Sequence, residues 1–93
     1  METLKRKADL SVKRTMNLDD ETIIEYIPIT VGKAAKIHKI KGLDEFEKGL
    51  HIIAAQIRIN GQEVMPDDLM DSFTVEEFTK IAEFVNPSDE KNG

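Results

Sequence analysis

The chain contains no cysteine and no tryptophan, and its aromatic residues are one tyrosine and four phenylalanines. Without cysteine, neither a disulfide framework nor a thiolate metal ligand is available, and a reducing compartment is compatible with the chain. No apolar run approaches the roughly 20 residues that cross a bilayer, and no apolar segment follows the charged start of the chain. We therefore expect a cytoplasmic protein with no signal peptide, no membrane span and no membrane partner.

The sequence also lacks the common motifs of catalysis. Neither GxxxxGK nor GxGxxG occurs, and no serine lies in a glycine-flanked elbow. His38 and His51 are too far apart to form an i,i+4 pair, and Asp67, Asp68 and Asp71 lack the ligand spacing of a calcium-binding loop. We predict that the protein is not an enzyme, uses no cofactor and holds no metal.

The length of 93 residues predicts a single small domain. Its folded body is expected to span residues 9–86. The ends, residues 1–8 and 87–93, are mainly polar and offer little apolar surface to offset the entropy of ordering, so we expect both to be disordered.

Charge is distributed unevenly along the chain. The formal net charge is −5, yet nine acidic and only two basic residues lie from Ile59 onward. Lys33, Lys36, Lys39 and Lys41 give an earlier segment a basic character that can meet phosphates. Because the chain is acidic overall and has few aromatic residues for base stacking, we interpret these lysines as a solvated helix face and expect no nucleic-acid partner. The asymmetry itself can orient a partner or promote head-to-tail association.

Two segments near the N-terminus have the pattern of an antiparallel β-hairpin. Residues 10–16 alternate apolar and polar side chains, and residues 22–29 are rich in β-branched ones, with the polar residues 17–21 between them. Pro28 has no amide hydrogen to donate to a neighbouring strand. The second strand should therefore lie at a sheet edge or stop near Pro28.

Helices are predicted after this hairpin. Thr30 suits the N-cap of a helix over residues 31–41, which Gly42 should end in a left-handed conformation. Asp44 and Glu47 then resemble a capping box, in which each side chain accepts a hydrogen bond from the other residue's amide.

The second helix has an apolar stripe at spacings of four, three and four, formed by Phe46, Leu50, Ile53 and Ile57. Asn60-Gly61 then has two interpretations: a C-cap of this helix, or the type I′ turn of a small hairpin between residues 56–59 and 62–65. We favour the C-cap, because helical spacing precedes it.

Two further helices are predicted towards the C-terminus. Pro66 suits the first turn of a short helix over residues 67–71. Thr74 and Glu77 form a capping box before a stripe that we expect to face the core, made of Val75, Phe78, Ile81, Ala82 and Val85. The predicted fold is therefore α+β, with an N-terminal β-hairpin followed by three to four short helices.

Apolar residues outside the inward stripes are candidates for a partner surface. Phenylalanines at helical positions are typically core residues, but Phe73 and Phe84 fit the stripes least well. We expect them to form an exposed apolar patch with Met65, Leu69 and Met70 that binds a partner.

The strand-to-helix junction, residues 26–33 with the sequence YIPITVGK, resembles a segment of the small tail assembly chaperones of long-tailed bacteriophages. That segment reads leucine-arginine, any residue, then proline-threonine-valine-glycine-aspartate, and the match is sharpest at residues 30–32. Lys33 replaces the family's acidic residue, and no arginine precedes the proline. The order of parts agrees over residues 11–85: a hairpin, this junction, an aliphatic helix and the DDLM…FTVEEFTKIAEFV segment.

The resemblance implies a chaperone that binds and solubilises the tape measure protein and helps tail tube subunits assemble around it. Such a protein works in the cytoplasm of the host cell and is absent from the finished virion. The expected partners are thus the tape measure protein and the tail tube protein. Association of the chain into a homo-oligomer is also compatible with the sequence. A chaperone for an amphipathic helical client needs an apolar groove with a charged rim.

Two alternatives stay open. One is a small DNA-binding regulatory protein of a mobile element, which would use the basic helix and lose duplex affinity steeply with salt. The other is a small connector or tail-completion protein, which would be found in purified particles.

Overall fold

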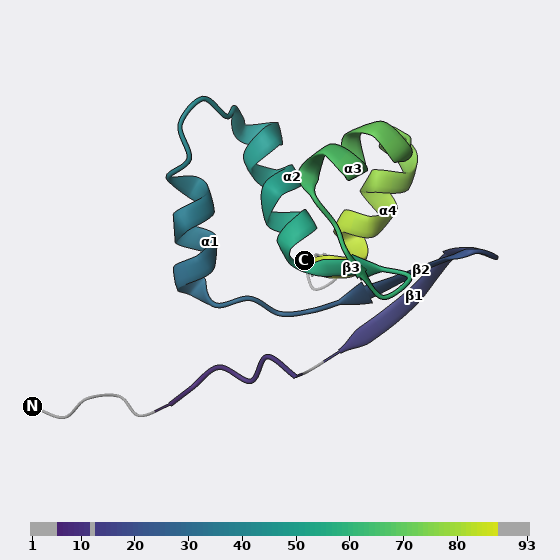
Figure 1. Ribbon diagram of the computed structural model, residues 1–93, viewed down its shortest axis with the longest axis horizontal. Helices are drawn as coiled ribbons and strands as arrows, with labels where there is room; N and C mark the ends of the chain where they lie inside the picture. Colours follow the sequence, from purple (N-terminus) through teal and green to yellow (C-terminus); the bar gives the residue numbers. More distant parts are fainter. Residues whose placement is uncertain (1–5, 12, 88–93) are drawn as a thin grey trace, which may run out of the picture.

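Four helices lie on one side of a four-stranded antiparallel sheet in the computed structural model, which describes residues 6–11 and 13–87 (Figure 1). The elements in chain order are β1 (Arg14–Asp19), β2 (Thr22–Tyr26), α1 (Val31–His38), α2 (Glu45–Ala55), β3 (Ile57–Ile59), β4 (Gln62–Glu63), α3 (Pro66–Ser72) and α4 (Val75–Val85). The predicted α+β fold with an N-terminal hairpin is confirmed. Most residues of the two ends expected to be disordered lie outside the described residues.

The sheet has the order β1-β2-β3-β4, so it contains two strands more than the predicted hairpin. β1 begins at Arg14 instead of residue 10 and continues to Asp19, which leaves a two-residue turn in place of the expected five-residue loop. β2 is an inner strand and ends at Tyr26, two residues before Pro28. The Ile27 amide still donates a hydrogen bond of 2.7 Å to the Gln56 carbonyl on the β3 side, so the amide hydrogen that Pro28 lacks would have pointed towards β1, where the ladder stops.

The favoured interpretation of Asn60-Gly61 as a helix C-cap is wrong, and the alternative, a hairpin turn, is observed. Asn60 and Gly61 have φ angles of 51° and 81°, the positive pair that a type I′ turn requires. The α2 helix ends at Ala55, and Ile57 lies opposite Tyr26 on β2. Pairing with the open side of β2 therefore overrides the helical spacing of the sequence.

The Asn60 side chain also links the two hairpin turns. Its Oδ1 accepts a hydrogen bond of 2.9 Å from the Ile23 amide, and its Nδ2 donates one of 3.1 Å to the Glu21 carbonyl. This residue thus stabilises both the local turn and the packing of the β3–β4 hairpin beside β2.

The predicted helix starts are confirmed. Thr30 Oγ1 accepts a hydrogen bond of 3.1 Å from the Lys33 amide. The α1 helix ends at His38, however, so Gly42 does not end it and lies in the following loop, with φ of 89°. Reciprocal capping boxes begin α2 at Asp44 and α4 at Thr74. Within the described residues, no helix is both long enough and apolar enough to span a membrane.

The core lies between the sheet and α2, α3 and α4 and consists of Ile24, Leu50, Ile53, Ala54, Ile57, Val64, Leu69, Ile81 and Val85. The expectation that Leu69 lies in an exposed patch is wrong, because its side chain is only 2% exposed. Conversely, Phe46 and Val75 were expected in the core but are 60% and 78% exposed. Both lie in the first turn of their helix, at the end directed away from the sheet (Figure 1).

Candidate functional site

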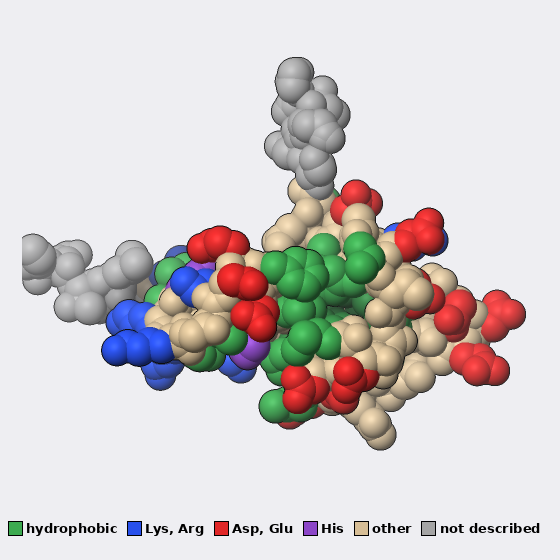
Figure 2. Space-filling view, turned by 90° about the horizontal axis from the view of Figure 1, so that it is seen from above, with side chains coloured by type: hydrophobic (Ala, Val, Ile, Leu, Met, Phe, Trp, Pro, Cys, Tyr) green, Lys and Arg blue, Asp and Glu red, His purple; other side chains and the backbone are tan. Residues whose placement is uncertain are grey.

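An apolar cleft opens where the first turns of α2 and α4 meet α3, on the side of the molecule opposite the sheet. We call it the helical cleft. Its volume is about 150 Å³, and its lining residues are Phe46, Leu50, Leu69, Met70, Phe73, Thr74, Val75 and Phe78. Figure 2 looks down on this side and shows a band of hydrophobic side chains across the middle of the molecule. A cavity of this volume holds about one benzene-sized group, so the cleft accommodates a single apolar side chain.

The helical cleft has a buried floor and an exposed rim. Leu50 and Leu69 form the floor, each 2% exposed. Phe46, Met70 and Val75 form the rim and expose between 50% and 78% of their surface. Three large apolar side chains around one opening leave apolar area in contact with water, which a partner's side chain could cover.

Local sequence holds this rim in place. The capping boxes of Asp44 with Glu47 and of Thr74 with Glu77 fix the first turns of α2 and α4, with hydrogen bonds between 2.8 and 3.0 Å. The Phe46 ring packs edge-to-face on Phe78, at 5.9 Å between centroids and 68° between planes. The rim is therefore formed before any partner arrives.

Acidic side chains lie at the starts of the helices that form the helical cleft, outside its apolar lining. The first turns of the three helices that form it each carry two: Glu45 and Glu47, Asp67 and Asp68, and Glu76 and Glu77. Figure 2 shows carboxylate groups on both sides of the hydrophobic band, whereas lysine and arginine side chains gather mainly at the end of the molecule where α1 lies. The positive ends of the helices offset part of this charge. The rim nevertheless favours an apolar group with basic neighbours.

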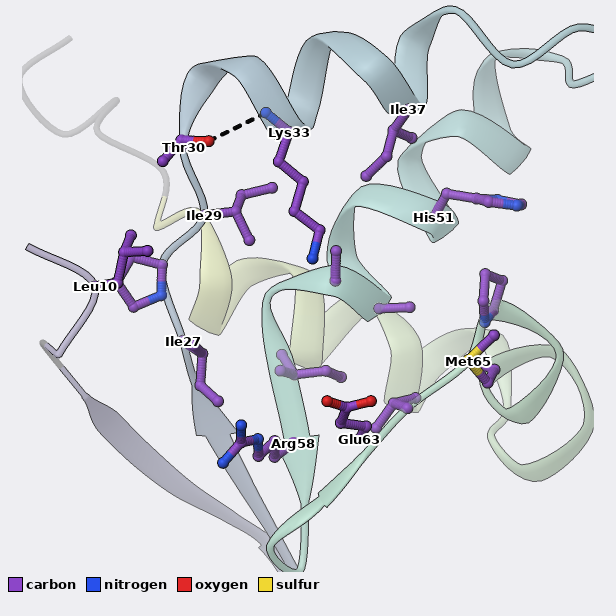
Figure 3. Close-up of a pocket in the computed structure, with 16 residues that line it drawn as sticks. Leu10, Ile27, Ile29, Thr30, Lys33, Ile37, His51, Arg58, Glu63 and Met65 are labelled. Carbon is purple, nitrogen blue, oxygen red and sulfur yellow. Dashed lines mark hydrogen bonds between the residues drawn. The ribbon is translucent and has the colours of Figure 1, made fainter. Parts of the chain in front are cut away.

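A second and larger hollow of about 480 Å³ lies between α1, α2 and the β3–β4 hairpin (Figure 3). Its walls are mainly apolar, and Lys33 reaches into it from α1, while Arg58 and Glu63 lie on the hairpin side. His51 also lines the hollow, but its Nδ1 lies 2.9 Å from the Glu47 carbonyl of the same helix. The polar groups come from separate elements and do not converge on one point. Among the described residues, no cluster of acidic and histidine side chains could hold a metal ion.

The five residues expected to form one patch lie in three places. Leu69, Met70 and Phe73 line the helical cleft, with Leu69 in its floor. Met65 is exposed but lines the larger hollow beside α1. Phe84 is half-buried and packs at the other end of α4, against β1.

Phe84 lies next to Arg14 of β1. The guanidinium carbon lies 5.1 Å from the centre of the Phe84 ring and 4.4 Å from that of Tyr26. Arg14 also donates hydrogen bonds of 3.1 and 3.4 Å to the carbonyls of Phe84 and Val85 at the end of α4. This contact joins the last turn of α4 to the sheet.

Sequence reasoning missed Phe46 and Val75 as rim residues. Both belong to apolar stripes that predict burial, and nothing in the spacing indicates that these stripes extend beyond the core. Their position in the first turn after an N-cap is the one indication that the sequence offers.

Shifted pKa values occur at two exposed carboxylates, Asp9 and Asp19, neither of which lines a hollow. The Glu21 amide donates a hydrogen bond of 2.9 Å to the Asp19 carboxylate, which lowers the pKa of Asp19 below its usual 3.8. The Ser11 hydroxyl and amide lower the pKa of Asp9 in the same way. These carboxylates stabilise local turns.

No protein-family model, no curated protein and no solved structure matches this chain.

Proposed function

We propose that this protein is an assembly chaperone that binds an apolar side chain on a helical segment of its client in the helical cleft. The observation that carries the proposal is the cleft itself, with its buried floor, exposed apolar rim and acidic surroundings. The client that we propose is the tape measure protein of a long-tailed bacteriophage, because residues 26–33 resemble the junction of the tail assembly chaperones. On this proposal the protein acts in the host cytoplasm and leaves before the virion is complete.

The size of the helical cleft suits reversible binding. Burying one large apolar side chain contributes about 1.5–3 kcal/mol, and ordering the client offsets part of that gain. A single cleft therefore binds weakly, whereas several chaperone molecules along one long helix shield it from aggregation. Weak individual contacts also allow tail tube subunits to displace the chaperone.

The proposal is tested by co-expression with the tape measure protein of the same genome. The cleft variant carries Met70→Ser and Val75→Ser, two exposed positions whose replacement leaves the core intact. Ile23→Thr is the matched control, because Ile23 is 47% exposed and lies on β2, outside the helical cleft. We expect the wild type and the control to keep the client soluble and to co-purify with it, and the cleft variant to lose both properties.

The result that would overturn the proposal is an insoluble client beside a folded wild-type protein. Equal solubilisation by the wild type and the cleft variant would place the client surface elsewhere. Circular dichroism and urea denaturation of each variant separate a loss of binding from a loss of folding.

A second candidate function is nucleic-acid binding through α1. None of the side chains of α1 is buried, and Lys33, Lys36 and Lys39 carry no ion pair within 4.0 Å in the described part of the chain. This candidate predicts that duplex affinity falls steeply with salt and is lost when the three lysines become glutamine. The chaperone proposal predicts neither effect.

A further inference from the structure

The start of α1 differs from the starts of the other three helices. In α2, α3 and α4 the third residue after the N-cap is acidic, and its carboxylate accepts a hydrogen bond from the N-cap amide; these residues are Glu47, Asp68 and Glu77. In α1 this position is Lys33, and the first turn carries no acidic residue. The positive end of the helix dipole disfavours an ammonium group there. Local helix chemistry therefore does not explain Lys33.

The Lys33 side chain extends from this turn into the larger hollow between α1 and α2, which Arg58 of β3 also lines (Figure 3). Within the described residues, neither cation has a carboxylate within 4.0 Å, although Glu63 lies opposite Arg58 in the pairing of β3 and β4. A residue that breaks a local rule of its own helix indicates a function elsewhere. We infer that the two cations serve a ligand of the hollow.

The larger hollow is too big for a single side chain. Its volume of about 480 Å³ is about three times that of the helical cleft and lies within the range of ligand pockets, roughly 300–1,000 Å³. Ala54, Ile57 and Val64 line it and are buried, whereas Met65 at its edge is 63% exposed. The short side chains of Ala54 and Ala55 on α2 leave this space open. Several aliphatic groups side by side would fill it.

We propose that the larger hollow binds a short segment of a partner protein in which aliphatic side chains lie between acidic ones. The aliphatic side chains cover the apolar walls, and the carboxylates accept hydrogen bonds from Lys33 and Arg58. The two cations come from different elements and do not converge, so they suit a segment with separate carboxylates. The helical cleft favours basic neighbours instead, so the two surfaces select different partners. This inference depends on neither the cleft nor the client.

The test is an NMR titration of the isotope-labelled wild-type protein with a peptide of sequence DLALALD. We expect saturable shifts of the amide signals of Lys33, Ala55 and Arg58, and no such shifts with KLALALK or DSASASD, which lack the acidic or the aliphatic groups. The proposal is overturned if DLALALD causes no saturable shift at the hollow, or if KLALALK binds equally well. Saturable shifts with decanoate but not with DLALALD would overturn it in favour of a fatty acyl ligand.

Two variants with the same change of charge separate binding from helix stability. Lys33→Glu should weaken DLALALD binding by about tenfold or more, because a charge-assisted hydrogen bond is lost. The same change should increase the helicity of α1 in its Cα chemical shifts, because glutamate completes a capping box with Thr30. Lys36→Glu, in the last turn of α1 and outside the hollow, should lower that helicity and keep the affinity.

Equal loss of affinity in the two variants would reduce the effect to overall charge and overturn the proposal. A loss of both α1 helicity and binding in Lys33→Glu would make Lys33 a structural residue and also overturn it. Ala55→Leu tests the apolar part of the site, because the larger side chain occupies the hollow and leaves both cations in place. We expect this variant to bind DLALALD more weakly, and wild-type affinity in Ala55→Leu would contradict the proposed location.

The cleft variant, Met70→Ser with Val75→Ser, distinguishes this proposal from the proposed function. Neither position lines the larger hollow, so the variant should bind DLALALD like the wild type while it loses the client. A wild type that binds DLALALD without solubilising the client would support the site in the hollow and reject the chaperone. A wild type that solubilises the client without binding DLALALD would do the reverse.

Discussion

Leu69 and Met70 are neighbours in α3 with opposite environments, which makes a sharp test of the structure. Leu69 is 2% exposed in the core, and Met70 is 50% exposed on the rim of the helical cleft. Replacing a buried leucine by alanine costs about 2–5 kcal/mol. Since Leu69 lies beneath an open cleft, part of the new space joins that opening and the cost should lie in the lower half of this range.

Met70→Ala removes contacts of a side chain that is half in water, and surface substitutions usually change the free energy of unfolding by no more than about 0.5 kcal/mol. For a domain of this size, 1 kcal/mol corresponds to about 4–8 °C in Tm. We therefore expect Leu69→Ala to lower the Tm by roughly 8–28 °C, and Met70→Ala by roughly 4 °C or less. Urea and thermal denaturation followed by circular dichroism measure both values.

Equal losses of stability in the two variants would refute the assignment of Leu69 to the core and Met70 to the rim. The outcome also decides how binding is tested. If Leu69 is a core residue, replacing Leu69, Met70 and Phe73 together would unfold the domain and could not isolate a loss of client binding.

Two further predictions concern β1 and its turn. In the Arg14→Lys variant the lysine keeps the positive charge but cannot reach both carbonyls at the end of α4. The free energy of unfolding should therefore fall by about 0.5–1.5 kcal/mol. A urea midpoint equal to that of the wild type would contradict this role. The hydrogen bond from the Glu21 amide lowers the pKa of Asp19 in the folded state. The stability that this carboxylate contributes is therefore fully present above the pKa of the unfolded state, near pH 4. It is lost as the pH falls through the lower pKa of the folded state. An NMR titration checks the direction, and an Asp19 carboxylate that titrates at or above 3.8 would contradict it.

Features that depend on a few adjacent residues could be predicted from the sequence. The helix starts after Thr30, Asp44 and Thr74 were predicted because a capping side chain bonds to an amide only three residues away. The end of β2 before Pro28 was predicted because proline lacks an amide hydrogen wherever it occurs. Local chemistry decides these features, so no knowledge of the rest of the fold is needed.

Tertiary contacts decided what the same local patterns left ambiguous. Ile57 continues the helical spacing of α2, but residues 57–59 form a strand because the free side of β2 offers hydrogen bonds that an extended backbone can make. The α3 helix has seven residues, which is too few for its spacing to show whether Leu69 or Met70 faces inward. The sequence by itself therefore determined where most elements begin. Only the tertiary structure decided the pairing of β3 and which residues form the helical cleft, because the pairing and the cleft both depend on neighbours far away in the chain.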